Sequence, residues 1–86
     1  MVEKPLVFTL HAEAKLAERA IARAWVERVT RAPDWVEREP HDDAADRRFG
    51  AVAEFSGRVL RVVCVETKTE IRIITATFDR NARRSR

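Results

Sequence analysis

The sequence predicts an α+β domain in which two N-terminal helices cover one face of an antiparallel sheet of about four strands. Two apolar, β-branched segments, 59–65 and 71–77, lie in the last third of the chain and are predicted to be central strands. Residues 10–32 instead carry apolar residues at helical spacing. A pair of helices followed by a run of strands is typical of a two-layer α+β domain.

The N-terminal part of the chain predicts a short edge strand and two helices. Residues 6–8 are apolar, and Pro5 suits a sheet edge because proline cannot donate to a strand ladder. Thr9 is the expected N-cap of a helix over about 10–20, and a second helix is expected over about 22–32, before Pro33. The expected apolar stripe of the first helix is Leu10, Ala14, Ala17 and Ile21, with Leu16 and Ala20 on its flank. The stripe of the second helix is Trp25, Val26, Val29 and Ala32.

The remaining chain predicts strands and tight turns. Residues 35–38 begin an extended segment, and the acidic stretch 40–46 is expected to be a loop. In the strand that follows, Phe49, Ala51, Ala53 and Phe55 alternate with polar residues. The last three strands are expected over 47–55, 58–66 and 70–78, with turns at 56–57 and 66–69. The element order is β-α-α-β-β-β-β within a single domain spanning residues 1–86.

Composition places the chain among small globular domains. Its 86 residues are 45% hydrophobic, which suits one core and one domain. No apolar stretch approaches the roughly 20 residues of a membrane-spanning helix, and the N-terminus is unlike a signal peptide, so no membrane association is expected. The single cysteine, Cys64, is expected to be a small buried hydrophobe rather than a reactive thiol. These features favour a cytoplasmic location.

The net charge of +3 is unevenly distributed. Residues 1–43 carry seven Lys/Arg against nine Asp/Glu, whereas residues 44–86 carry ten against five. Fourteen of the 17 basic residues are arginine, whose planar fork matches phosphate. The alternative is codon bias, because a GC-rich genome would also favour arginine over lysine. The arginines of the last seven positions are Arg80, Arg83, Arg84 and Arg86.

No metal site or cofactor is predicted. His11 and His41 do not stand at a ligand spacing with the cysteine or with each other, and His41-Asp42-Asp43 is expected to be a solvated loop. His11, one helical turn from Lys15, could act as an acid or base near neutral pH. The alternative is an exposed histidine on a charged helix face.

Two arginines interrupt the apolar strands. If the strands pair across the short turn, Arg61 and Arg72 are expected to lie near each other or one pair apart. Two like charges at that separation need an anion or a carboxylate between them. Glu54 or Glu66 could supply the carboxylate, and a bound phosphate is the functional alternative.

Residues 11–21, His-Ala-Glu-Ala-Lys-Leu-Ala-Glu-Arg-Ala-Ile, resemble the opening motif of a family of small uncharacterised bacterial domains. That motif has His-Ala, a basic residue and then Glu-Arg-Gly-Ile. Looser matches are Ala32-Pro33-Asp34, Leu60-Arg61-Val62-Val63 and Ile73-Ile74-Thr75-Ala76. The family is similar to the RelE/ParE and BrnT toxins, which share two helices packed on a curved antiparallel sheet.

The resemblance implies candidate functional residues. Many relatives cleave RNA without a metal, using basic residues and an acid/base group in the concavity of the sheet. Two departures bear on activity, because Lys15 stands where the family usually has arginine and Ala20 where it usually has glycine. The positions that the resemblance carries over are His11, Lys15, Arg19, Arg61 and Thr75.

Together these features predict a toxin-like RNA-binding domain, with metal-independent cleavage of RNA as its candidate activity. His11 would be the acid/base group, and Arg61, Arg72 and Arg80 would hold phosphates, with Arg83 and Arg84 adding contacts from the tail. One alternative is a non-enzymatic module that binds a protein partner, such as an antitoxin, through a sheet edge. Another is a nucleic-acid backbone binder that uses the tail alone.

Overall fold

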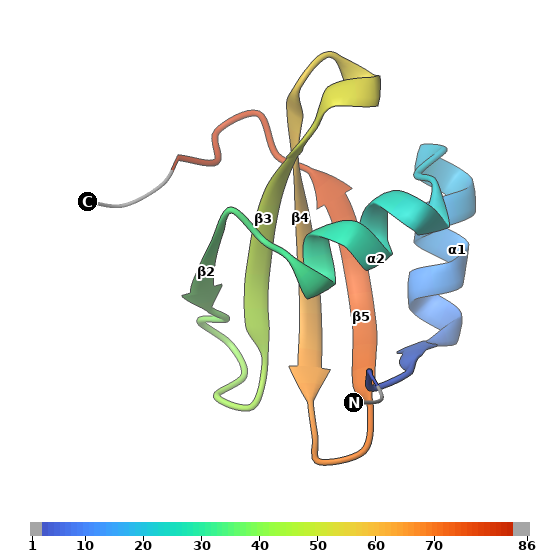
Figure 1. Ribbon diagram of the computed structural model, residues 1–86, viewed down its shortest axis with the longest axis vertical. Coiled ribbons are helices and arrows are strands. Elements are labelled where there is room, and N and C mark those ends of the chain that lie inside the picture. Colours follow the sequence, from blue (N-terminus) through green and yellow to red (C-terminus); the bar gives the residue numbers. More distant parts are fainter. Residues whose placement is uncertain (1–2, 84–86) are drawn as a thin grey trace.

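Five strands form one sheet in the computed structural model, which describes residues 3–83 (Figure 1). Their spatial order is β1-β5-β4-β3-β2. The order of helices and strands along the chain is as predicted, but the sheet is mixed rather than antiparallel, with five strands rather than about four. The elements are β1 (Leu6–Phe8), α1 (Leu10–Arg19), α2 (Arg23–Arg31), β2 (Trp35–Arg38), β3 (Asp46–Val52), a 3₁₀ turn (Ala53–Phe55), β4 (Arg58–Glu66) and β5 (Ile71–Phe78).

The strand that departs from the antiparallel prediction is β1. It lies at the sheet edge, as Pro5 predicts, but it runs parallel to β5, with Leu6 opposite Ile71 and Phe8 opposite Ile73. Parallel neighbours need a long crossover between them. The two helices and three strands between β1 and β5 provide that connection. Because no short turn joins β1 to β5, the two strands can run parallel.

The hairpin of β4 and β5 is the centre of the sheet, as predicted. The two strands are antiparallel from Leu60↔Phe78 to Glu66↔Ile71, and Thr67 N donates to Glu70 O across the turn (2.9 Å). A bulge interrupts the register beside Val63 and Cys64. Because the side chains of a strand alternate, the hairpin has one face against the helices and one face away from them.

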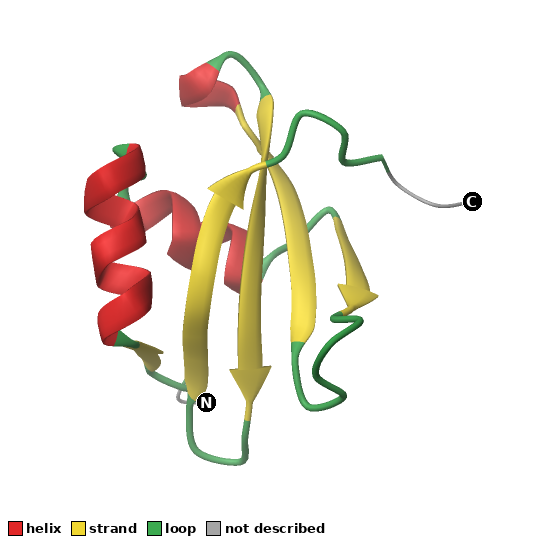
Figure 2. Ribbon diagram, turned by 180° about the vertical axis from the view of Figure 1, so that it is seen from behind, coloured by secondary structure: helices red, strands yellow, loops and turns green. Residues whose placement is uncertain are grey.

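Helix α1 begins as the sequence predicts but buries a different stripe. The Ala12 amide donates to Thr9 Oγ1 (3.1 Å), which confirms Thr9 as the N-cap. Its buried residues are Ala12 and Leu16. Of the predicted stripe, Ile21 is buried just after the helix, whereas Leu10 is 90% exposed. The reason is position: α1 packs on β5 and β1 at the sheet edge, where only a narrow side of the helix meets the core (Figure 2).

Helix α2 crosses β3 and β4 and covers the middle of the sheet. Val26 and Val29 are buried as predicted, but Ala32 is exposed because the helix ends before it. Val29 lies directly over Gly50, where an added Cβ would meet Val29 Cγ2 at 3.0 Å. Glycine at this position therefore lets α2 approach β3 closely.

The apolar alternation of β3 does not lie on the side of the helices. Gly50 and Val52 face the helices, so Phe49 and Ala51 point to the other face. The strand also ends at Val52, and Phe55 belongs to the 3₁₀ turn. A one-residue change of register exchanges the two faces of a strand, and the close contact between α2 and Gly50 determines which face is inward.

The core lies between α2, α1 and the inward residues of β4 and β5. Leu60, Val62, Cys64 and Ile73 are fully buried. Burial raises the pKa of the Cys64 thiol to about 11, so the thiolate is absent near neutral pH and the cysteine serves as core packing. Within residues 3–83, no helix combines the length and the apolarity needed to cross a membrane.

We expect Leu60→Ala to lower the free energy of unfolding by about 2–5 kcal/mol, because it opens a cavity in the centre of the core. Leu10→Ala makes the same chemical change at a 90% exposed position and should alter stability by no more than about 0.5 kcal/mol. Urea denaturation of the two variants measures both values. Equal losses would contradict the assigned core.

Candidate nucleic-acid interface

One face of the sheet carries no helix within the described residues (Figure 2). Because Leu60, Val62 and Cys64 point into the core, the residues between them on β4 point to this face. We call it the open face. Its side chains, assigned from the strand registers, are Trp35, Glu37, Arg47, Phe49, Ala51, Val59, Arg61, Val63, Val65, Arg72, Thr75 and Thr77.

An aromatic pair covers the β2 side of the open face. The rings of Trp35 and Phe49 stack at 4.7 Å with an interplanar angle of 4°, and Phe49 is only 3% exposed. Trp35 Nε1 also donates to Glu37 Oε2 (3.1 Å). Phe49 is thus buried by a neighbouring side chain rather than by a helix, which the alternation of β3 in the sequence did not reveal.

The two strand arginines do not form a pair. Arg61 is opposite Thr77, whereas Arg72 is opposite Val65, so they are four residues apart along β4, roughly 13 Å. Each has its own carboxylate: Arg61 Nη1 lies 2.8 Å from Asp79 Oδ2, and Arg72 Nη2 lies 2.9 Å from Glu70 Oε2. The prediction that they are neighbours is therefore wrong, and the carboxylates are not those expected.

Three of the predicted functional residues follow one stripe of α1. His11, Lys15 and Arg19 are spaced by four residues, which places them on the same side of the helix. Arg19 Nη1 donates to the backbone oxygen of Ala76 on β5 (2.8 Å), and Lys15 Nζ lies 3.3 Å from Glu18 Oε2. The stripe therefore borders β5, the strand that carries Thr75.

Arg19 has a structural contact as well as a position in the candidate site. Strand β1 covers only the first part of β5, so carbonyl groups at the end of that edge lack a strand partner. Thr9 N donates to Ile73 O (3.1 Å), Thr9 Oγ1 donates to Ile74 O (3.3 Å), and Arg19 donates to Ala76 O. A guanidinium has five N–H donors, so Arg19 can make this bond and still contact an anion.

The structure brings the predicted residues together only in part. Thr75 is opposite Val63, which makes it a diagonal neighbour of Arg61 on the open face. His11 lies about 12 Å from Arg19 along the helix axis, at the beginning of α1. It is exposed, and no hydrogen bond or ion pair within residues 3–83 connects it to Arg61.

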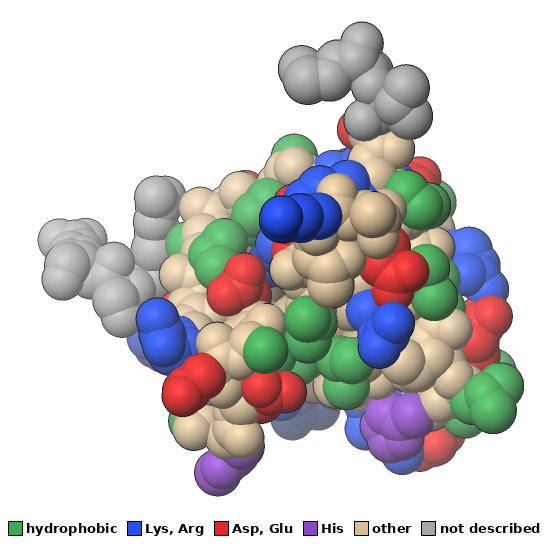
Figure 3. Space-filling model, turned by 90° about the horizontal axis from the view of Figure 1, so that it is seen from below, with side chains coloured by type: hydrophobic (Ala, Val, Ile, Leu, Met, Phe, Trp, Pro, Cys, Tyr) green, Lys and Arg blue, Asp and Glu red, His purple; other side chains and the backbone are tan. Residues whose placement is uncertain are grey.

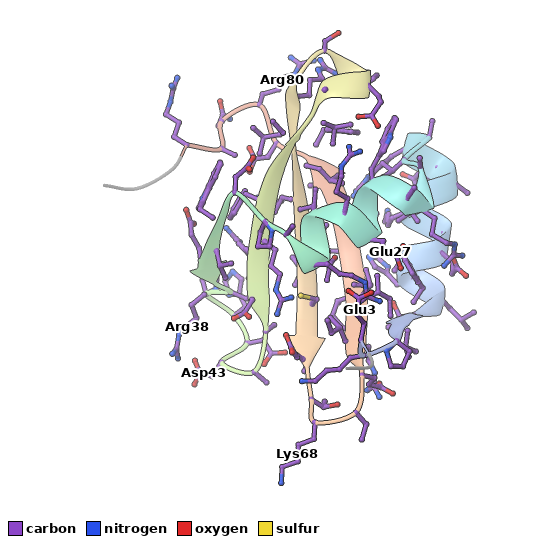
Figure 4. The ribbon with its side chains drawn as sticks, viewed as in Figure 1. Glu3, Glu27, Arg38, Asp43, Lys68 and Arg80 are labelled. Carbon is purple, nitrogen blue, oxygen red and sulfur yellow. The ribbon has the colours of Figure 1, made fainter. Side chains whose placement is uncertain are left out.

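The end of the sheet where β4 begins and β5 ends carries exposed arginines. Arg58, Arg80 and Arg83 form no ion pair with another described residue, and all three are exposed. Figure 4 shows Arg80 at this end and Lys68 at the opposite end. We call Arg58, Arg80 and Arg83 the basic end. Arg58 is not among the functional residues predicted from the sequence, where only its place directly after the Ser56-Gly57 turn could have indicated it. Arg84, which was predicted, lies outside the described residues.

An aromatic cluster supports the basic end. The rings of Phe55 and Phe78 are 4.7 Å apart, and each lies 6.0 Å from the ring of Trp25. The Arg58 guanidinium lies 5.1 Å above the Phe55 ring, a cation–π contact. This packing orients the Arg58 side chain without neutralising its charge.

Most other arginines are neutralised within the chain. Arg28 and Glu54 form a two-bond pair, each at 2.9 Å, and this pair lowers the pKa of Glu54 to about 2. A salt bridge joins Arg47 to Glu39 and lowers the pKa of the Glu39 carboxyl. Another joins Arg48 to Glu66, and hydrogen bonds from Lys4 and Arg48 lower the pKa of the Glu66 carboxyl. Figure 3 shows acidic and basic side chains intermixed on the end that it views. Unmatched positive charge is therefore concentrated at the basic end.

No group of three or more His, Cys, Asp or Glu residues is placed to hold a metal ion in the part of the chain that the structure describes. The open face thus offers guanidinium groups, threonine hydroxyls and aromatic rings. These groups donate hydrogen bonds to phosphate oxygens and provide surfaces for stacking.

The fold and this surface define a small α+β domain with an uncovered, arginine-flanked sheet face. A family model described as "Domain of unknown function (DUF4258)" matches residues 8–78, from the end of β1 to the end of β5. The chain belongs to this family. No curated protein and no solved structure matches the chain.

We expect the Glu54 carboxyl to titrate near pH 2 in the folded protein, well below its ordinary value of 4.5, because Arg28 donates two hydrogen bonds to the carboxylate. Since the folded pKa is the lower one, the pair stabilises the fold above about pH 4.5, and this contribution is lost as the pH falls towards 2. NMR titration of the carboxyl carbon measures this midpoint.

Arg28→Ala should return the Glu54 midpoint towards its ordinary value, and Arg31→Ala, which removes a cation paired with Glu27, should leave it unchanged. A midpoint near 4.5 in the unaltered protein would refute the pairing and would leave Arg28 available to bind an external anion.

Proposed function

We propose that this protein is a toxin-like RNA-binding domain with a RelE-like arrangement, which binds single-stranded RNA across the open face and the basic end. The observation that carries the proposal is a set of exposed arginines, Arg58, Arg80 and Arg83, at one end of a sheet face. Within residues 3–83 these arginines have no carboxylate partner and no helix covers that face. A cytoplasmic location, where RNA is present, belongs to the same proposal.

The chemistry of the surface suits a single strand. Guanidinium groups bind phosphate oxygens, and the threonine hydroxyls of β5 can donate to phosphates or to the 2′-hydroxyls that distinguish RNA from DNA. Unpaired bases stack on aromatic rings and arginine planes. Trp35 provides a ring on the open face, and Arg58 provides a guanidinium plane at the basic end, beside Phe55 of the 3₁₀ turn. A strand that crosses from the basic end along β5 would pass Thr77, Thr75 and the stripe of α1.

The non-enzymatic alternative is a protein partner, such as an antitoxin, that adds to a sheet edge. Strand β2 is the exposed edge that favours it, because Val36 is 50% exposed there. Against this alternative, β2 has only four residues and ends in a charged one, Arg38, which limits the pairing that an added strand could make. The RNA proposal therefore ranks first, and the partner is an outcome of its test.

We expect RNA binding to weaken steeply with salt and to depend on the basic end. Replacing Arg58, Arg80 and Arg83 together by alanine should reduce the slope of log affinity against log salt by roughly 2, at about 0.7 for each phosphate contact on a single strand. Fluorescence anisotropy of a labelled oligoribonucleotide measures the slope. Lys68→Ala, at the opposite end, should leave it unchanged.

If the protein binds no RNA even at low salt, the proposal is wrong and the protein partner becomes the leading function. If it binds RNA but the triple variant keeps the original slope, the basic end is not the contact surface.

Cleavage is a second candidate function, favoured by the stripe that joins His11 to Lys15 and Arg19. The exposed imidazole would take the proton of a 2′-hydroxyl that attacks the adjacent phosphate, and the bond from phosphorus to the 5′-oxygen would break, with that oxygen taking a proton from water. The Lys15 cation, one turn from His11, would stabilise the charge that develops on the phosphate, and Arg19, one turn further along α1, would hold a neighbouring phosphate. His11 needs no metal for this role. Because His11 stands on α1 and Arg61 on β4, the reacting phosphate would lie beside α1 rather than in the middle of the sheet.

His11→Ala should lower RNA cleavage by roughly 10²–10⁴-fold, the range for loss of a positioned proton-transfer group. His41→Ala is the matched control, because it removes the other histidine from an exposed loop and should leave the rate unchanged. Cleavage of a single-stranded RNA is followed on gels with and without a chelator. Equal rates for the His11 variant and the unaltered protein would refute the catalytic role, as would loss of cleavage on adding chelator.

A further inference from the structure

A cavity of about 300 Å³ opens at the basic end. It lies between the turn that enters β4 and the turn that follows β5. Asp79 N donates to Val59 O (2.9 Å) and Ala82 N donates to Asp79 O (3.3 Å), so the chain after β5 folds back over the start of β4. The residues that line the cavity are Gly57, Arg58, Val59, Phe78, Asp79, Arg80 and Ala82.

The charges around this cavity do not balance. Among the described residues, Asp79 is the one carboxylate that lines it. Both of its oxygens are occupied, because Oδ2 accepts from Arg61 (2.8 Å) and Oδ1 accepts from Asn81 N (2.9 Å). Arg61 therefore neutralises Asp79. Arg58 and Arg80 are left with two positive charges and no carboxylate among the described residues.

Two unmatched guanidinium groups at one cavity suit a doubly charged anion better than a singly charged one. A phosphodiester within an RNA chain carries one negative charge, whereas a terminal phosphomonoester carries about −1.5 to −2 near neutral pH. The terminal group also presents three oxygens, which can accept from both arginines. A cavity of about 300 Å³ is at the lower end of the range for small-molecule sites, which suits a single nucleotide.

The surroundings of the two arginines add a surface for the nucleotide itself. Arg58 lies over the Phe55 ring and is exposed, so its guanidinium plane can also stack on a base. Phe78 lines the cavity and packs against Phe55. Gly57, with φ +70°, has no neighbouring atom within 4 Å of a built Cβ, so the mouth of the cavity is open beside it.

We infer that this cavity binds the phosphorylated end of an RNA strand, with the terminal phosphomonoester held between Arg58 and Arg80. The inference deepens the proposed function, on which it rests, because it assigns one end of the bound RNA to one cavity and leaves the rest of the strand to the open face. The protein would then recognise a phosphorylated RNA end as well as bind the RNA backbone.

The test compares three fluorescent oligoribonucleotides of one single-stranded sequence, with a 5′-phosphate, a 3′-phosphate or hydroxyls at both ends. One of the phosphorylated forms should bind roughly ten- to a hundredfold more tightly than the hydroxyl form, the gain from one added set of charge-assisted hydrogen bonds. Arg58→Ala and Arg80→Ala should each remove most of that difference. Adenosine monophosphate, but not adenosine, should compete for it.

Lys68→Ala is the matched control, because it removes one positive charge at the far end of the sheet and should keep the full difference. Circular dichroism checks that the variants are folded, which is expected because Arg58 and Arg80 are exposed. Equal binding of all three oligonucleotides would overturn the inference and leave the proposed function intact. A preference that survives both arginine variants would also overturn it. Binding of none of the three would overturn the proposed function as well.

Discussion

The alternation of side chains along β4 determines most of what this protein presents to solvent. Leu60, Val62 and Cys64 are fully buried beneath the helices. They lie on β4, which pairs with β3 on one side and β5 on the other. Because the row is buried, the residues between its members must lie on the open face. Arg61 is placed there opposite Thr77, and the surface proposed to bind RNA is a geometric consequence of how the core packs.

Charge neutralisation shapes this surface as much as charge content does. Residues 44–86 carry ten Lys/Arg against five Asp/Glu, but several of those arginines contact carboxylates. Arg47 pairs with Glu39 of the other half of the chain, and Arg72 pairs with Glu70, in the turn just before β5. A phosphate that approaches Arg47 or Arg72 would have to compete with an existing partner. The arginines of the basic end have none among the described residues, so a small part of the molecule carries most of the unmatched charge.

Helix α1 completes the hydrogen bonding of the sheet edge and also carries part of the candidate site. Its N-cap, Thr9, and its last residue, Arg19, satisfy carbonyl groups of β5 that the short β1 leaves without a strand partner. The same placement brings the His11 stripe beside the strand that carries Thr75. Stability and the candidate site therefore share residues here, and the match of the DUF4258 model to residues 8–78 includes both.

The sequence by itself determined the order of the elements, the Thr9 cap, the turn at Ser56-Gly57 and the central hairpin, because each depends on local propensity or on the residues of a single turn. Only the tertiary structure decided which face of α1 and of β3 is inward. Ala12 replaces Leu10 at the core, and Gly50 replaces Phe49 beneath α2. The inward face of each element depends on where a helix crosses the sheet. A short segment with apolar residues on both sides does not determine which side will be inward. The carboxylate partners of Arg61 and Arg72 also depend on the tertiary structure. The register of β4 and β5 separates the two arginines, so Arg61 pairs with Asp79, which follows β5, and Arg72 pairs with Glu70.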